Sequence, residues 1–171
     1  MTKEIVYINA MDKIYTLIET GAYSNAIKIM KKRGRLSGVY LYDVNHSWYI
    51  IGDAYFKMKN YHMAIKAFKR ACKVYPEDWA ALMAIGNSYS ELGRPKLAEK
   101  IFRKALLIEP ENMALWFNLA NALFDQKKFN LALVEYSKIA RTECGLSSRA
   151  NNMIDMIYKH NNKSVNGTPD A

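Results

Sequence analysis

The sequence predicts an all-α protein that is built as a solenoid of helical repeats. Two observations support this fold class. One set of residue types recurs at a fixed interval of 34 residues. Within each interval, apolar residues at helical spacing predict two helices. In addition, 50% of the 171 residues are hydrophobic, but no apolar run approaches the roughly 20 residues of a membrane span. We expect about three and a half repeats and a C-terminal cap helix.

The repeat is clearest between Asn45 and Asn112, where two blocks match in residue type at eight positions. The first block supplies Trp48, Ile51, Gly52, Tyr55, Ala64, Phe68, Ala71 and Pro76. The second supplies Leu82, Ile85, Gly86, Tyr89, Ala98, Phe102, Ala105 and Pro110. The register continues into a third block with Trp116, Leu119, Ala120, Leu123, Ala132, Tyr136, Ile139 and Cys144. Over about residues 7–146, this pattern resembles the tetratricopeptide repeat (TPR).

The resemblance implies a right-handed helical-repeat solenoid. In this family the first helix of each repeat lines the concave side and the second helix faces the convex side. We therefore expect a single domain with a degenerate first repeat, in which Ile14 replaces the small residue of later repeats. The domain spans residues 1–160 and contains repeats at about 7–40, 45–78, 79–112 and 113–146 and a cap helix at about 148–160. A disordered tail follows at 161–171.

Several residues predict how the helices pack and begin. Gly52 has no side chain, so the two helices of its repeat can approach closely. Asp78 and Asn112 stand where an N-cap belongs, and Pro95 falls in the first turn of a helix. The stretch from Gly38 to Val44 adds four residues to the period. It is either a surface insertion or a segment that packs into the mouth of the groove.

The residues between the repeat positions of the first helices would line the concave groove. They are Met, aromatic, Asp and Asn residues: Met11, Tyr15, Tyr49, Asp53, Phe56, Met83, Asn87, Phe117, Asn118, Asn121 and Phe124. Aromatic and Met side chains offer adaptable apolar contact, and an Asn amide can pair with a peptide backbone. We expect this set to bind a peptide or protein segment, although any one member can instead pack against a neighbouring repeat.

The groove lacks one feature of TPR domains that hold chaperone C-termini. Those domains grip the terminal carboxylate with Lys, Arg and Asn. The corresponding positions here are Ile8, His46, Ala80 and Ala114, which provide no pair of cations. We therefore expect no binding of Hsp70 or Hsp90 tails.

The net charge of +9 is concentrated on the second helices. A basic patch on the predicted convex side is densest at Lys28, Lys31, Lys32, Arg33 and Arg35. It is either a solvated face that keeps the protein soluble, or a surface for an acidic protein, nucleic acid or anionic lipid. No aromatic residues interleave with the cations, which does not favour nucleic acid.

Nothing in the sequence predicts an enzyme or a cofactor. His46, His62 and His160 have no metal-like spacing, and no Gly-rich phosphate loop appears. Cys72 and Cys144 are expected to be reduced, and the N-terminus has no apolar core of a signal peptide, which predicts a cytoplasmic protein without a membrane span.

The predicted function is non-catalytic protein binding through the groove, as an adaptor or a chaperone. The layout resembles that of bacterial type III secretion chaperones. Two alternatives stay open. The chain can be a structural subunit of a larger assembly, which an aggregation-prone or homodimeric free protein would favour. It can also bind an acidic partner, nucleic acid or an anionic membrane through the basic patch.

Overall fold

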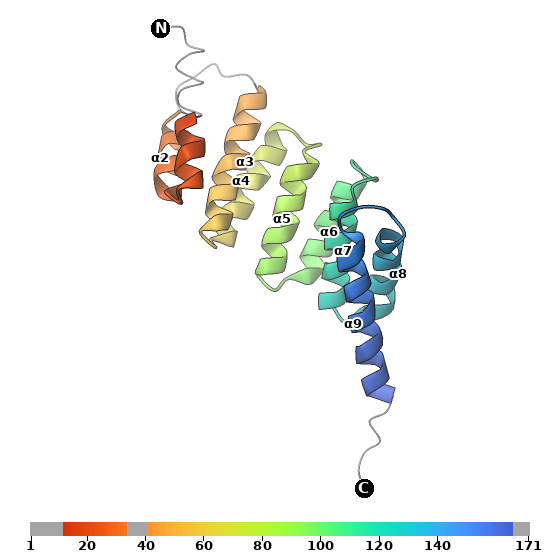
Figure 1. Cartoon of the computed structure of the whole chain (residues 1–171). Helices are drawn as coiled ribbons and strands as arrows, with labels where there is room; N and C mark the ends of the chain where they lie inside the picture. Colours follow the sequence, from red (N-terminus) through yellow and green to blue (C-terminus); the bar gives the residue numbers. More distant parts are fainter. Residues whose placement is uncertain (1–11, 34–40, 166–171) are drawn as a thin grey trace. The chain divides into compact units, whose positions relative to one another are not determined.

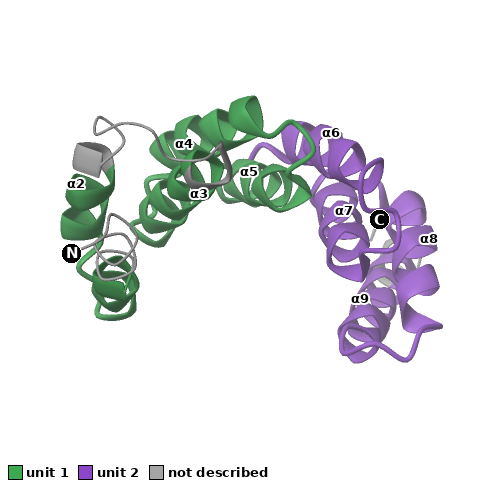
Figure 2. Cartoon of the chain, turned by 90° about the horizontal axis from the view of Figure 1, so that it is seen from above, with its two compact units in different colours: residues 1–92 green, residues 93–171 purple. Residues whose placement is uncertain are grey.

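The computed structural model describes residues 12–33 and 41–165, and these residues form helices joined by short turns (Figure 1). No strand occurs in this part of the chain. The prediction of an all-α helical-repeat fold is confirmed. The chain divides into two compact units, residues 1–92 and residues 93–171 (Figure 2).

Unit 1 consists of successive antiparallel helices. A helical segment at 12–19 is followed by α2 (Tyr23–Arg33), α3 (Leu41–Lys57), α4 (Tyr61–Val74) and α5 (Trp79–Glu91). Helix α2 packs on α3, α3 on α4, and α4 on α5. Helix α3 also contacts α5, which is the first helix of the following repeat. A cluster of buried residues joins the first elements: Ile14, Ile18, Ala26, Met30, Ile50, Ile51 and Ala67.

Unit 2 continues the same plan with α6 (Pro95–Leu106), α7 (Met113–Asp125), α8 (Phe129–Ala140) and α9 (Ser147–Val165). The pairs α6–α7, α7–α8 and α8–α9 are in contact. Large side chains that are at most 1% exposed fill the space between these helices: Phe102, Leu115, Leu119, Leu123, Tyr136, Ile139 and Ile157. Within each unit, therefore, every helix is held by apolar contact with its neighbour in the sequence.

The helix starts follow the local sequence. The Asp78 carboxylate accepts a hydrogen bond from the backbone N–H of Ala81 at 2.8 Å. Asn112 accepts from Ala114 and Leu115 at 3.1 Å each, and Asn60 caps α4 by accepting from Met63. Pro95 occupies the first turn of α6, where its missing N–H is harmless. The predicted caps at Asp78 and Asn112 and the predicted position of Pro95 are confirmed.

The turn inside each repeat uses one residue in the left-handed backbone region. These residues are Gly21, Lys59, Gly93 and Lys127, with φ between 57° and 76°. Gly93 lies 34 residues after Lys59 and 34 before Lys127, whereas Gly21 lies 38 before Lys59. The interval between the first two turns is therefore four residues longer than the others, as the sequence predicts.

Two boundaries differ from the sequence-based expectation. Helix α3 begins at Leu41, so residues 41–44 are helical rather than part of an inserted loop. Residues 38–40 of that stretch lie outside the described part of the chain. Helix α9 ends at Val165, and therefore continues five residues past the expected end at 160, into the segment that we expected to be a tail.

Candidate protein-interaction surfaces

In unit 1, the predicted groove residues lie on neighbouring first helices. The Tyr15 hydroxyl is 2.7 Å from Nε2 of His46, which ties the helical segment at 12–19 to α3. Tyr15 itself is 44% exposed. On α3, Tyr49, Asp53 and Phe56 recur at the spacing of one helical face, and on α5 Met83 and Asn87 repeat this spacing. We call this set of six residues the first-helix face of unit 1.

Tyr49 forms the half-buried centre of this face. Its ring lies 5.4 Å from the ring of Phe68, centroid to centroid, so one side of Tyr49 belongs to the core. Burial, followed by the charges of Asp53 and Asp78, raises the pKa of the Tyr49 phenol above its ordinary value. The phenol is therefore neutral at physiological pH. Asp53 forms an ion pair with Lys57 at 3.1 Å on the same helix.

Phe56 ends the face at the C-terminal turns of α3. Its ring packs edge-on against Tyr61 of α4, at a centroid distance of 5.3 Å, and is only partly buried. The Tyr61 hydroxyl donates a hydrogen bond to Glu91 at 3.0 Å. Met83 and Asn87 on α5 are also partly exposed. All six residues of the first-helix face therefore reach solvent.

In unit 2, the expectation of an exposed groove lining is wrong for Phe117. This residue is only 5% exposed, and its ring packs edge-on against Tyr136 at 5.6 Å. The Arg149 guanidinium of α9 lies over the ring, 4.7 Å from its centroid. Phe117 is thus covered by the chain's own last helix. The sequence predicted that helix but not where it would pack.

The remaining predicted residues of unit 2 are also engaged by the chain itself. Asn121 Oδ1 accepts a hydrogen bond from the Tyr136 hydroxyl at 2.5 Å. Burial, followed by the charge of Asp125, raises the pKa of Tyr136 far above its ordinary value, so this hydroxyl keeps its proton. The Phe124 ring contacts Phe129, which in turn contacts His160 of α9. Asn118 is half-buried.

The structure describes little of the predicted basic patch. Lys28 is exposed on α2. Lys31, Lys32 and Arg33 belong to the same helix, but their side chains are not among those described, and Met11 and Arg35 lie outside the described residues. The patch therefore remains a prediction.

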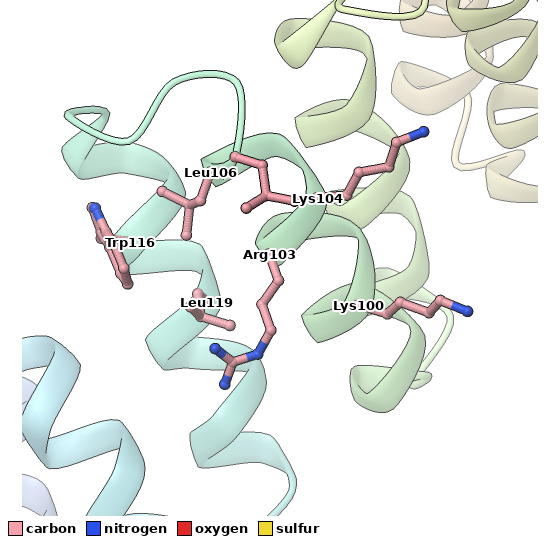
Figure 3. A pocket seen from close by; sticks show the side chains of 7 residues that line it. Lys100, Arg103, Lys104, Leu106, Trp116 and Leu119 are labelled. Atoms are coloured by element: carbon pink, nitrogen blue, oxygen red, sulfur yellow. The ribbon is translucent and has the colours of Figure 1, made fainter.

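Sequence reasoning missed a pocket between α6 and α7, which has a volume of about 490 Å³ (Figure 3). Apolar and basic side chains line it: Lys100, Arg103, Lys104, Leu106, Leu107, Trp116 and Leu119. The adjacent leucines Leu106 and Leu107 did not reveal it, because adjacent apolar residues such as Ile50 and Ile51 can both be buried in this fold. Leu107 is 85% exposed.

Within 12–33 and 41–165, no group of three or more His, Cys, Asp or Glu side chains is arranged to hold a metal ion. No helix in the same part of the chain is both long and apolar enough to cross a membrane.

Comparison with known families identifies the repeats. Two tetratricopeptide-repeat models match the chain, one over residues 47–78 and the other over residues 83–144. Together these matches cover more than half of the 171 residues. No curated protein sequence matches the chain.

Several solved structures share the fold. A putative kinesin light chain of Podospora anserina with nearly identical TPR-like repeats has a TM-score of 0.76 and 12% identity, over 95% of this chain and 90% of that one. The Sgt2 TPR domain of Aspergillus fumigatus has a TM-score of 0.66 and 22% identity, over 74% and 85%. The Yersinia enterocolitica type III secretion chaperone SycD, in complex with a peptide of the translocator YopD, has a TM-score of 0.64 and 16% identity, over 74% and 98%. At these identities the likeness is one of fold.

Proposed function

The chain belongs to the tetratricopeptide-repeat family, a family of protein–protein interaction modules, and from this premise we propose that it is a non-catalytic adaptor or chaperone. It would bind an extended segment of a partner protein on the first-helix face of unit 1. The observation that carries this proposal is the exposure of all six residues of that face, in contrast to the covered Phe117 of unit 2.

The chemistry of the first-helix face suits a peptide of mixed polarity. Tyr15 and Phe56 present partly exposed rings, and Met83 adds a flexible apolar side chain. On the same face, Asp53 and Asn87 supply polar groups that can fix the direction of a bound backbone. Rings and Met give adaptable apolar contact, and the polar groups give orientation.

The polar groups also bear on the kind of peptide. A captured C-terminal carboxylate needs cations, and the equivalent positions in the described part of unit 1 hold His46 and Ala80. The His46 ring is in contact with Tyr15. We therefore propose an internal segment rather than a C-terminal tail as the ligand. The complex of SycD with a peptide of YopD supports a peptide as the class of probe.

The test begins with a random peptide library displayed on phage and selected on the full chain. The affinity of an enriched peptide is then measured by fluorescence anisotropy for wild type, Tyr15→Ser and Phe56→Ser. Each substitution removes one partly exposed ring, so we expect about 10-fold weaker binding. Thermal melts of both variants show whether the fold is retained.

Tyr75→Ser is the matched control, because Tyr75 is 53% exposed in the turn between α4 and α5 and lies outside the first-helix face. Its affinity should stay within about twofold of wild type. Two results would show that the first-helix face is not the binding site. In one, Tyr75→Ser weakens binding as much as Phe56→Ser does. In the other, neither Tyr15→Ser nor Phe56→Ser changes the affinity.

A further inference from the structure

The pocket between α6 and α7 has an apolar base. Leu119 of α7 is fully buried and Leu106 of α6 is 7% exposed, and they face each other across the space between the helices (Figure 3). Trp116 of α7 and Arg103 of α6 also line the pocket (Figure 3). Leu107 follows the last residue of α6 and exposes 85% of its surface at the edge. An exposed leucine beside an open apolar pocket has no role in the core of unit 2.

The Trp116 ring, which forms one side of the pocket, is fixed by its contacts. Its indole Nε1–H donates to the backbone carbonyl of Pro110 at 2.7 Å. The Lys138 ammonium lies over the ring, 4.9 Å from its centroid, and is itself paired with Glu135 at 2.8 Å. Because the indole is hydrogen-bonded at its edge and covered by an ammonium group on one face, the ring has little freedom to rotate into the pocket and close it. The pocket is therefore a preformed feature of unit 2.

The charged residues that line the pocket are all basic. Lys100, Arg103 and Lys104 line it, and no carboxylate does. Glu99 is the single acidic residue of α6, and it is already bound to Arg103 at 3.0 Å and to Lys128 at 3.0 Å. In the described part of the chain, Lys100 and Lys104 have no carboxylate partner. Both are exposed, and their ammonium groups extend from α6 on the side away from Trp116 (Figure 3).

We propose that this pocket and the adjoining surface of α6 form a second docking site, which binds an acidic segment of a partner protein. One large apolar side chain of that segment would enter the pocket between Leu107 and Trp116. Carboxylates next to it would pair with Lys100 and Lys104. The site is independent of the first-helix face, because it lies in the other unit. On α7 itself, Trp116 and Leu119 are three residues apart and occupy a different side from Asn121 and Phe124.

Two features favour an acidic peptide over a polyanion. A nucleic acid or an anionic bilayer presents a continuous layer of phosphates and would gain nothing from an apolar pocket. A bilayer could contact the protruding Leu107, but it could not reach Leu106 and Leu119, which lie at the base of a depression. A peptide can place an apolar side chain and a carboxylate within a few residues of each other, which matches the mixed lining of this site.

The test uses isotope-labelled full-length protein and two peptides of about a dozen residues. One peptide alternates Glu and Asp around a central Phe, and the other has Ser at that centre. The chain has three tryptophans, so the indole N–H signal of Trp116 reports on the pocket while those of Trp48 and Trp79 serve as internal references. We expect the Phe peptide to shift the Trp116 signal saturably, and the Ser peptide to bind severalfold more weakly.

Four variants separate the two parts of the site. Lys100→Gln with Lys104→Gln should weaken the Phe peptide about threefold to tenfold, and Leu107→Ser should weaken it by a similar factor. The charge-matched control is Lys66→Gln with Lys73→Gln on α4, and the apolar control is Leu131→Ser, which is 53% exposed on α8. Neither control should change the affinity by more than about twofold.

Three results would overturn the proposal. The first is equal binding of the Phe and Ser peptides. The second is a response confined to Trp48 or Trp79. The third is a shift of the Trp116 signal by an oligothymidylate or by phosphatidylserine vesicles that is as strong as the shift by the Phe peptide and indifferent to Leu107→Ser. That last result would assign the surface to polyanions in general.

Discussion

Gly52 of α3 lies directly against the ring of Phe68 in α4. A Cβ atom placed on Gly52 would be 2.5 Å from both Cδ1 and Cε1 of that ring, which is closer than carbon atoms can approach. Phe68 is 2% exposed and also contacts Tyr49, so its ring has no room to retreat. The absent side chain of Gly52 therefore sets the spacing of α3 and α4.

Gly52→Ala should destabilise the protein although alanine is the better helix former. The helix preference of alanine is worth about 1 kcal/mol, whereas forcing a methyl group into a packed core costs about 1–3 kcal/mol. We expect a net loss of about 1 kcal/mol in the free energy of unfolding, measured by urea denaturation. Gly145→Ala is the control, because a Cβ there meets no atom within 4 Å. A Gly52→Ala protein as stable as the control would contradict the close packing.

Asp78 should matter more than the equivalent cap Asn112. Besides capping α5, the Asp78 carboxylate accepts a hydrogen bond at 2.8 Å from the side chain of Asn45, which is buried. Asn45 also donates to the carbonyl of Ala71. We expect Asp78→Ala to cost about 2 kcal/mol and Asn112→Ala about 1 kcal/mol, because only the first leaves a buried amide with a lost partner.

The comparison of Asp78→Ala with Asn112→Ala is made by chemical denaturation under identical conditions. Each cap stands 34 residues from the other in the repeat, so both variants lose a cap at an equivalent helix start. Equal losses of stability would show that the bond between Asn45 and Asp78 contributes nothing.

Glu99 should make stability depend on pH in the acidic range. Burial pushes the pKa of its carboxyl upward, but hydrogen bonds from Gln126, Lys128 and Arg103 outweigh burial and hold the pKa below its ordinary value. Because the folded pKa is lowered, the stabilisation is present above the unfolded pKa of about 4.3. It is lost as the pH falls through the folded pKa.

The matching measurement is a series of thermal melts of wild type and Glu99→Gln between neutral and acidic pH. Glu99→Gln should cost about 1–2 kcal/mol at neutral pH, and the difference should shrink below pH of about 4. Glu77→Gln is the control, since Glu77 is exposed in the turn before α5. A difference that is constant across the pH range would show that the charge of Glu99 is not what stabilises the unit.

The packing of α9 can be tested with two neighbouring residues. Ile157 is fully buried, whereas Met156 is 52% exposed. Ile157→Ala should lower the free energy of unfolding by about 2–4 kcal/mol, because it opens a cavity under the helix. Met156→Ala should change it by no more than about 0.5 kcal/mol. If both variants unfold alike, α9 is not docked through this face, and the burial of Phe117 loses its explanation.

Features that depend on residues close in sequence could be predicted from the chain alone. The caps at Asp78 and Asn112, the position of Pro95 and the small residue at Gly52 follow from the requirements of helix ends and of a short helix pair. The 34-residue period repeats these requirements, so each one reinforces the others. The start of α3 was missed, because nothing in residues 41–44 distinguishes a helix from a turn without its neighbours.

By itself, the sequence determined the repeat family, the helix pairs and the residues at which they meet. Only the tertiary structure decided which candidate side chains remain accessible. Tyr15 and Phe56 stay partly exposed, whereas Phe117 is covered by Arg149 of α9. It also decided that Leu107 and Trp116 border an open pocket. Exposure depends on contacts between residues far apart in the chain, and a repeat pattern specifies contacts only between near neighbours.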